Sequence, residues 1–136
     1  MPKKLLLMLA FCSVSACQSL TTPPITATQL LGDWHIQQIN GQPVVDFSPA
    51  QLTFAENGKL SGNNSCNNFF GRYQLQAQQL HLMPAGSTMK ACVDVLMAQE
   101  QQVMQLLPQV VTAERQGNQL RLQGSQGATL LLLQRQ

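Results

Sequence analysis

The sequence predicts a mainly β domain with one helix, folded as a small curled antiparallel sheet or barrel. Two observations lead to this fold class. From Trp34 onward, short runs of alternating apolar and polar residues are separated by turn residues, and such alternation is typical of strands with one buried face. Only Val93–Leu107 has helical spacing instead. The length of 136 residues suits a single domain.

The predicted strands share one pattern, in which two apolar residues flank a polar one. The pairs are Trp34/Ile36, Leu52/Phe54, Tyr73/Leu75, Leu80/Leu82 and Leu120/Leu122. The predicted turns between strands are Asn40-Gly41, Asn57-Gly58 before Lys59–Gly62, Ala77-Gln78, Gly117-Asn118 and Ser125-Gln126-Gly127. The last strand, Ala128–Leu133, has no alternation over Leu130–Leu133, so we expect it to be covered on both faces. About seven or eight strands are expected.

The helix is predicted over Val93–Leu107. Its apolar residues, at positions 93, 96, 97, 103, 104 and 107, form one stripe. Asp94 favours the positive end of the helix, and Pro108 ends it. A stripe that contains Met97 and Met104 also suits a binding face, but packing on a sheet is the commoner use of such a stripe.

Residues 1–16 are predicted to be a lipoprotein signal peptide. Lys3 and Lys4 give it a positive start, and Leu5–Val14 is an apolar run of about ten residues, half of the roughly 20 that a membrane-spanning helix needs. Val14-Ser15-Ala16-Cys17 then resembles the bacterial lipobox. We expect Cys17 to be lipidated after cleavage; an ordinary signal with an incidental Cys is the alternative.

Residues 17–29 are predicted to be a flexible tether, because they are rich in Thr and Pro. A lipid on Cys17 would anchor the chain to a membrane. Gln18 stands where enteric lipoproteins of the inner membrane carry Asp. By this analogy we expect a lipid-anchored protein of the cell envelope, on the outer membrane and facing the periplasm.

The mature chain is expected to be neutral, since Lys3 and Lys4 account for the formal charge of +2. Its remaining basic residues are balanced by its acidic ones, and they form no cluster along the sequence. Contacts to phosphates need such a cluster, which argues against nucleic acid as a partner. The expected partners are the membrane, through Cys17, and an envelope protein or a small ligand.

Cys66 and Cys92 are the other cysteines of the mature chain. Two such cysteines in the oxidising envelope favour one disulfide. A loop of about 26 residues closed in this way would stabilise the fold by about 3.5 kcal/mol in the chain-entropy model. The alternatives are two buried thiols or one reactive thiol.

A catalytic thiol would need a base, and His35 and His81 are the only histidines. Each lies between two apolar strand residues, so we expect both to point to solvent. A Cys–His–Asn site using Asn67 or Asn68 is therefore disfavoured. Zinc is disfavoured too, because the sequence has no C-x-x-C or H-x-x-x-H pairing. We expect no enzyme activity, no metal and no cofactor.

The stretch Gly62–Gly71, GNNSCNNFFG, is the most unusual of the sequence. Gly and Asn at this density indicate positive φ angles and side chains that bond the local backbone. The simpler interpretation is a complex loop held by Cys66. The functional one is a polar binding loop beside two exposed aromatic rings. Its candidate binding residues are Asn63, Asn64, Asn67, Asn68, Phe69 and Phe70.

Several short motifs occur together in the order of a known family. They are Gly32-x-Trp34, Asn40-Gly41, Gly62-Asn63-x-x-Cys66-Asn67-Asn68-Phe69-x-Gly71-x-Tyr73 and Thr88-Met89-Lys90-Ala91-Cys92. In this order they resemble the META domain, and the chain looks like the HslJ-type heat-shock lipoproteins of Gram-negative bacteria. The resemblance covers roughly Leu30–Gln134, so we assign residues 30–136 to the domain. It implies a compact β structure with one helix, a role in envelope stress and no recognised catalytic residues.

The expected function is that of a non-enzymatic envelope lipoprotein. Through the resemblance we expect it to support tolerance of heat or of an antibiotic such as novobiocin, by binding a protein. One alternative is a barrel that holds a small molecule or a lipid. Another is a protease-inhibitor-like protein that presents the loop Asn63–Gly71. A buried cavity would favour the carrier, and an exposed apolar patch would favour protein binding.

Overall fold

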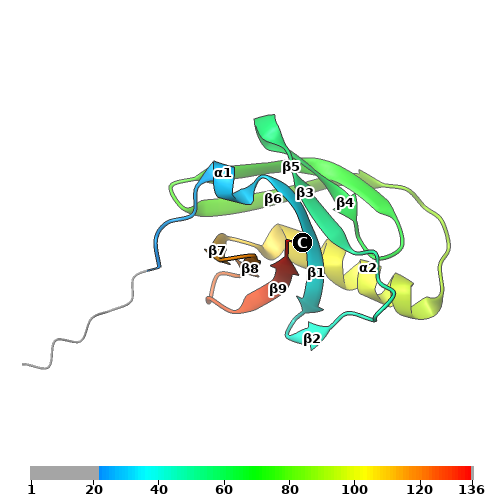
Figure 1. Ribbon diagram of the computed structural model, residues 1–136. Coiled ribbons are helices and arrows are strands. Elements are labelled where there is room, and N and C mark those ends of the chain that lie inside the picture. The colour runs from blue at the N-terminus through cyan, green and yellow to red at the C-terminus, as the bar shows by residue number, and fades with distance from the viewer. Residues whose placement is uncertain (1–21, 136) are drawn as a thin grey trace, which may run out of the picture.

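The computed structural model describes residues 22–135, and within them nine strands form one antiparallel sheet (Figure 1). The order along the sheet is β6-β5-β4-β3-β1-β9-β8-β7, and β2 pairs with β1. The strands are β1 Gly32–Ile39, β2 Gln42–Pro43, β3 Gln51–Phe54, β4 Lys59–Asn63, β5 Asn68–Gln76, β6 Gln79–Ser87, β7 Thr112–Gln116, β8 Gln119–Gln123 and β9 Thr129–Gln134. The helices are α1 Ala27–Leu30 and α2 Asp94–Leu106, with short 3-10 turns at η1 Glu56–Gly58 and η2 Leu107–Gln109.

The sheet is curled but does not close into a barrel. Its two outer strands, β6 and β7, approach each other at one point, where the Leu80 N–H donates to the carbonyl of Val111, just before β7, at 2.9 Å. Figure 1 shows α2 running along one side of the curl. The predicted fold class, a mainly β domain with a curled antiparallel sheet and one main helix, is confirmed.

The interior of the curl is filled with side chains. The inward residues of the predicted alternating pairs are all buried except Leu75, which is half-buried. Trp34, Leu52 and Phe54 are 0–1% exposed. One prediction was wrong here. β9 is not covered on both faces, because Leu131 and Leu133 are buried while Leu130 and Leu132 are only half-buried. Burial along Leu130–Leu133 therefore alternates every two residues, although the residue type does not change.

The helix α2 begins at Asp94 and ends at Leu106, close to the predicted bounds. Its C-terminal half joins the core through Val103 and Leu106. The predicted stripe is only partly buried, since Val93 is 59% and Met97 36% exposed. Gln99 is buried in their place. The helix therefore covers the sheet with its second half and leaves part of its apolar stripe in solvent at its start.

The folded structure begins before residue 30, where the sequence analysis places the start of the domain. Ile25 is 5% exposed within the core cluster, and α1 follows it directly. Three consecutive carbonyls at the end of α1 accept hydrogen bonds from the side chains of two strand residues and of Arg135, which directly follows β9. The donor–acceptor pairs are Arg115–Gln29, Trp34–Leu30 and Arg135–Leu31. The guanidinium groups of both arginines also lie over the Trp34 ring. We call residues 22–31 the N-terminal strap.

Candidate binding site beside the disulfide

Cys66 and Cys92 form a disulfide, as predicted. Their Cα atoms lie 5.8 Å apart, in the usual range for such a bond. The bridge joins the loop between β4 and β5 to the connection just before α2. Because both sulfurs are bonded to each other, neither cysteine can act as a thiolate nucleophile or a thiolate ligand. Cys17, the predicted lipidation site, and the predicted signal peptide lie outside the described residues.

The Asn-rich loop is held together by its own side chains. Asn64 is 0% and Asn67 3% exposed. The Asn64 side-chain oxygen accepts the N–H groups of Cys66 and Asn67, at 3.3 and 2.8 Å. The Asn63 side chain accepts the N–H of Ser65, and its amide donates to Asn68 at 3.0 Å. These are the local backbone bonds that the sequence indicated, so Asn64 and Asn67 are not offered to a ligand.

Asn67 also fixes the segment that runs from β6 to the helix. Its side-chain oxygen accepts the Thr88 hydroxyl at 2.9 Å and the Lys90 N–H at 2.8 Å, and its amide donates to the Lys90 carbonyl at 3.2 Å. The same amide lies 3.2 Å from both oxygens of Glu100 on α2. The Asn64 amide adds a bond to that carboxylate at 3.1 Å. One asparagine thus joins the loop, the connection and the helix.

Ser65 completes this network from a strained backbone position. Its φ is 106°, a region that side chains rarely adopt. Its hydroxyl donates to Gln99 at 3.0 Å and lies 3.2 Å from the Ser48 hydroxyl. The bond from Ser65 gives the Gln99 side-chain oxygen a hydrogen-bond partner. This explains why a polar residue of α2 can be buried, although the sequence pattern predicted no buried polar residue there.

The glycines that flank the loop are required by close backbone contacts. A Cβ atom on Gly62 would lie 2.0 Å from the Gln51 carbonyl oxygen, and one on Gly71 would lie 2.2 Å from that of Met83. At both places the neighbouring atom is backbone and cannot move aside. The backbone of β4 at Gly62 therefore approaches β3, and that of β5 at Gly71 approaches β6, more closely than a residue with a side chain would permit.

Above this polar network lies a surface groove of about 580 Å³. Its apolar lining comes from Met89, Ala91 and Met97, and its polar lining includes Asn67, Lys90 and Glu100. Met89 is 96% exposed. Val93 is the N-cap residue just before α2 and is 59% exposed. We call Met89, Ala91, Val93 and Met97 the methionine face.

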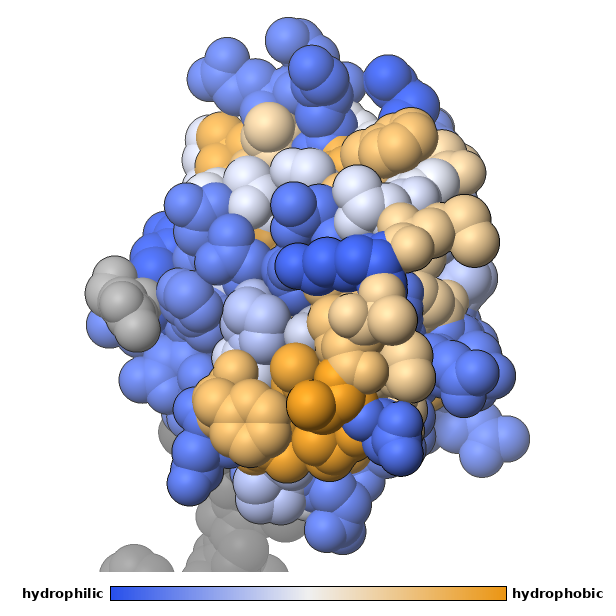
Figure 2. All heavy atoms as spheres, turned by 90° about the vertical axis from the view of Figure 1, so that its right-hand side faces the viewer, coloured by the Kyte–Doolittle hydropathy of each residue, from blue (hydrophilic) through white to orange (hydrophobic). Residues whose placement is uncertain are grey.

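Figure 2 looks onto this end of the molecule and shows apolar side chains over much of it, interrupted by hydrophilic ones. Phe70 adds an aromatic ring nearby. It is 61% exposed and lies against Gly86, next to Ser87 of the groove. The expectation of two exposed aromatics was wrong for Phe69, which is 2% exposed. Because β5 already runs through both residues, their side chains must point to opposite faces.

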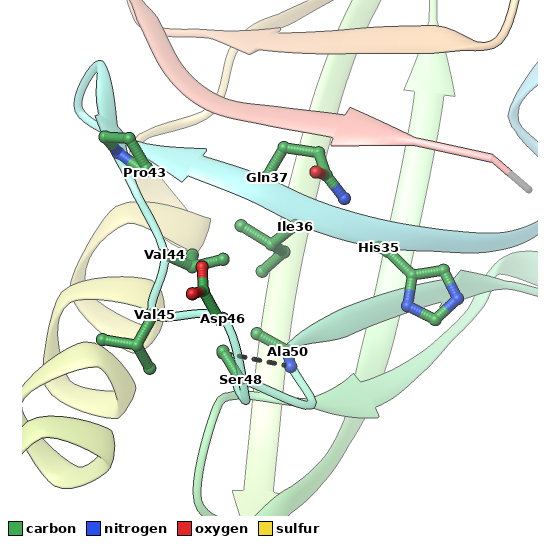
Figure 3. Close-up of a pocket in the computed structure, with 9 residues that line it drawn as sticks. All are labelled: His35, Ile36, Gln37, Pro43, Val44, Val45, Asp46, Ser48 and Ala50. Atoms are coloured by element: carbon green, nitrogen blue, oxygen red, sulfur yellow. Dashed lines mark hydrogen bonds between the residues drawn. The ribbon is translucent and has the colours of Figure 1, made fainter.

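A second cavity of about 420 Å³ lies beside β1 and contains His35, Asp46 and Ser48 (Figure 3). Figure 3 shows the His35 ring at one side of this cavity and Asp46 at the other. No hydrogen bond joins His35 to Asp46 or Ser48 in the described part of the chain, and His81 is exposed on β6. The arrangement provides no nucleophile–base pair.

Metal sites and membrane spans were also sought among residues 22–135. No group of three or more His, Cys, Asp or Glu side chains there is placed to hold a metal ion. Within the same residues, no helix has the length and apolar character to cross a membrane.

The comparisons with known proteins decide the family. The model of the META domain matches residues 27–136. The chain belongs to the META domain family. The match begins at residue 27, the first residue of α1, so the family domain includes this helix. No curated protein matches the chain.

Three solved structures share the fold of this META domain. An NMR structure of a protein is 25% identical, with a TM-score of 0.64 over 81% of this chain and 94% of the other. An NMR structure of a protein from Burkholderia xenovorans is 23% identical, with a TM-score of 0.62 over 93% and 99%. The crystal structure of a DUF4847 family protein from Bacteroides vulgatus is 14% identical, with a TM-score of 0.59 over 77% and 92%.

The methionine face was not predicted from the sequence. Met97 and Met104 belong to the predicted helical stripe, and Met89 belongs to one of the family motifs. One signal was present, because all four methionines after residue 16 fall between positions 83 and 104. Their clustering in one segment could have pointed to a common surface, but not to which of them are exposed.

Proposed function

We propose that this META domain is a non-enzymatic, lipid-anchored protein of the bacterial envelope that binds apolar segments of incompletely folded envelope proteins on its methionine face. Such binding would support tolerance of heat or of antibiotics such as novobiocin. The supporting observation is the 96% exposure of Met89, which lines a groove together with Ala91 and Met97. Solvent-exposed apolar side chains that share a groove are typical of a binding surface.

The thioether side chains favour a binder of varied sequences over a binder of one fixed partner. Methionine is unbranched and polarisable, so it adapts its shape to different apolar surfaces. The backbone that carries Met89 is nevertheless fixed by the disulfide and by Asn67. Flexible side chains on a rigid frame can take up an unfolded segment with little ordering of the binding protein itself.

The position of the strap supports a consistent orientation on the membrane. Four residues lie between Cys17 and Thr22, the first described residue, so the two Cα atoms are at most about 17 Å apart. In Figure 1 the strap leaves the domain at the left, where β7 and the β5–β6 turn lie, and the connection from β6 to α2 lies at the right. A lipid on Cys17 would hold the strap end at the membrane and direct the methionine face toward the periplasm.

The alternative functions have less support. A carrier of a small molecule or lipid would need an open interior. The interior of the curl is instead occupied by the side chains of Trp34, Leu52 and Phe54. An inhibitory loop must be exposed to enter a protease, and Asn64–Asn67 is buried instead.

Lipidation is tested by metabolic labelling with a radioactive fatty acid. Wild type is expected to incorporate the label and to fractionate with membranes, whereas Cys17→Ala should do neither. Equal incorporation by the variant would show that the lipid is elsewhere.

Binding is tested with a permanently unfolded polypeptide, reduced and carboxymethylated α-lactalbumin. Met89→Glu with Met97→Glu should weaken its binding by about tenfold or more, because two carboxylates would have to be desolvated. Met83→Glu is the matched control, since Met83 is 46% exposed on β6 but does not line the groove. Equal weakening by the control, or no binding by wild type, would overturn the proposal.

A further inference from the structure

Three of the four methionines of the described chain lie outside its core. The largest fully buried aliphatic side chains are all Leu or Val. By contrast Met89, Met83 and Met97 are 96%, 46% and 36% exposed, and Met104 is half-buried against the core. Leucine would supply a similar apolar area at these exposed positions but no oxidisable atom, so reactivity toward oxidants is a property that the sulfur adds.

We propose that Met89 is an oxidation site, followed by Met97, and that conversion of these thioethers to sulfoxides by hypochlorous acid releases apolar segments from the methionine face. This inference rests on the proposed function and adds to it a chemical switch. The reactive sulfur is accessible because almost the whole Met89 side chain is in solvent.

The absence of a competing thiol among residues 22–135 favours the reaction. Thiolates ordinarily react with oxidants before thioethers do, but Cys66 and Cys92 are already joined to each other. Their bridge also holds the segment that carries Met89. Within the described part, the exposed methionines are thus the first sulfur atoms that an oxidant meets.

The chemical step balances without any group supplied by the protein. The sulfur lone pair attacks chlorine, so that an S–Cl bond forms while the Cl–O bond breaks and hydroxide leaves. Water then attacks sulfur, chloride leaves with the S–Cl electron pair, and two protons are lost, one of which neutralises the hydroxide. Sulfur is oxidised by two electrons and chlorine is reduced to chloride, with one proton released overall.

The product is unsuited to apolar contact. A sulfoxide carries a polar S=O group that accepts hydrogen bonds from water. An apolar segment lying on the groove would remove that water and offer no donor in exchange. The Asn67 amide, which lines the groove, already donates its hydrogens to Glu100 and to the Lys90 carbonyl. Oxidation therefore opposes binding without unfolding the domain.

The test measures the order of oxidation and its effect on binding in the same samples. The mature protein is treated with increasing hypochlorous acid, and peptide mass spectrometry locates each added oxygen. Met89 is expected to react at the lowest dose, Met83 and Met97 next, and Met104 last. Binding of reduced and carboxymethylated α-lactalbumin should weaken about tenfold or more as Met89 and Met97 react, and methionine sulfoxide reductase should restore it.

The matched control is Met89→Leu with Met97→Leu, which keeps the apolar surface but removes the oxidisable sulfur. The affinity of this variant for the same polypeptide is measured before and after treatment, and the treatment is expected to leave that affinity unchanged. Oxidation of Met104 ahead of Met89 would overturn the inference, as would unchanged binding by oxidised wild type or loss of binding by the treated control. If untreated wild type fails to bind, the proposed function itself is wrong, whatever the order of oxidation.

Discussion

The two ends of this domain hold an irregular segment against the same sheet in different ways. At one end the N-terminal strap is fixed by burial, with Ile25 and Leu30 in the core and the Trp34 ring against the end of α1. At the other end the connection from β6 to α2 is fixed by the Cys66–Cys92 bridge and by the Asn67 side chain.

The difference determines which end has apolar side chains left for binding. The strap uses its apolar residues to attach itself, so they are hidden. The connection is attached by a covalent bond and by polar bonds, so Met89 and Val93 are not needed for attachment and remain exposed. Under the proposed function, stability and binding thereby depend on different atoms of the same segment. Four predictions test this division.

The largest effect is expected from Trp34→Ala at the strap end. Trp34 is 0% exposed, and its loss should lower the free energy of unfolding by about 3–5 kcal/mol through the cavity that it leaves. Trp34→Phe keeps most of the ring and removes only the bond to the Leu30 carbonyl, so its cost should be about 1–2 kcal/mol. Urea unfolding measures both, and equal costs would show that the ring does not hold the strap.

A slightly smaller effect is expected from Cys66→Ala with Cys92→Ala at the other end. Removal of a bridge with a sequence separation of 26 should cost about 3.5 kcal/mol. Hydrogen exchange should rise over residues 88–93 and stay unchanged over the strap, because Asn67 alone then holds the connection. An unfolding midpoint equal to that of wild type would contradict the role assigned to the bridge.

The two halves of α2 should respond differently to the same substitution. Leu106→Ala should cost about 2–4 kcal/mol, because Leu106 is 7% exposed within the core cluster. Leu96→Ala should cost about 1 kcal/mol, because Leu96 is half-buried in the half of the helix that the polar network attaches. Chemical denaturation distinguishes the two, and a larger cost at Leu96 would place the main attachment of the helix at its start.

The smallest effect is a loss of stability at alkaline pH near the strap. Burial, with a smaller contribution from the Glu56 carboxylate, raises the pKa of Tyr73 above its ordinary value of 10.0. The unfolded chain therefore loses this proton first, and stability should fall as the pH rises from about 10 through the pKa of the folded state. Tyr73→Phe should remove this part of the pH dependence of the unfolding midpoint. A profile with the same slope in both proteins would assign the effect to other groups.

Much of the fold could be predicted because its determinants are local. The two-residue alternation around Trp34 and Leu52 identifies inward side chains wherever the sheet happens to lie. The Asn40-Gly41 and Asn57-Gly58 pairs have the positive φ angles that their residue types favour. The strands β2 and β7 were not predicted, because Gln42–Pro43 is only two residues long and Thr112–Gln116 has no apolar alternation. Pairing with β1 defines β2, and pairing with β8 defines β7.

By itself, the sequence determined a mainly β fold with a single main helix, since period and turn chemistry are properties of short segments. The number of cysteines favoured the Cys66–Cys92 pair, and the structure decided for it and for a curled sheet that is not a closed barrel. Only the tertiary structure decided which polar residues turn inward and which apolar ones remain outside. Gln99 is buried because Ser65, 34 residues earlier, supplies its partner. Met89 is exposed because Asn67 and the disulfide already hold its segment. Such choices depend on contacts between residues far apart in the chain, and no local pattern encodes them.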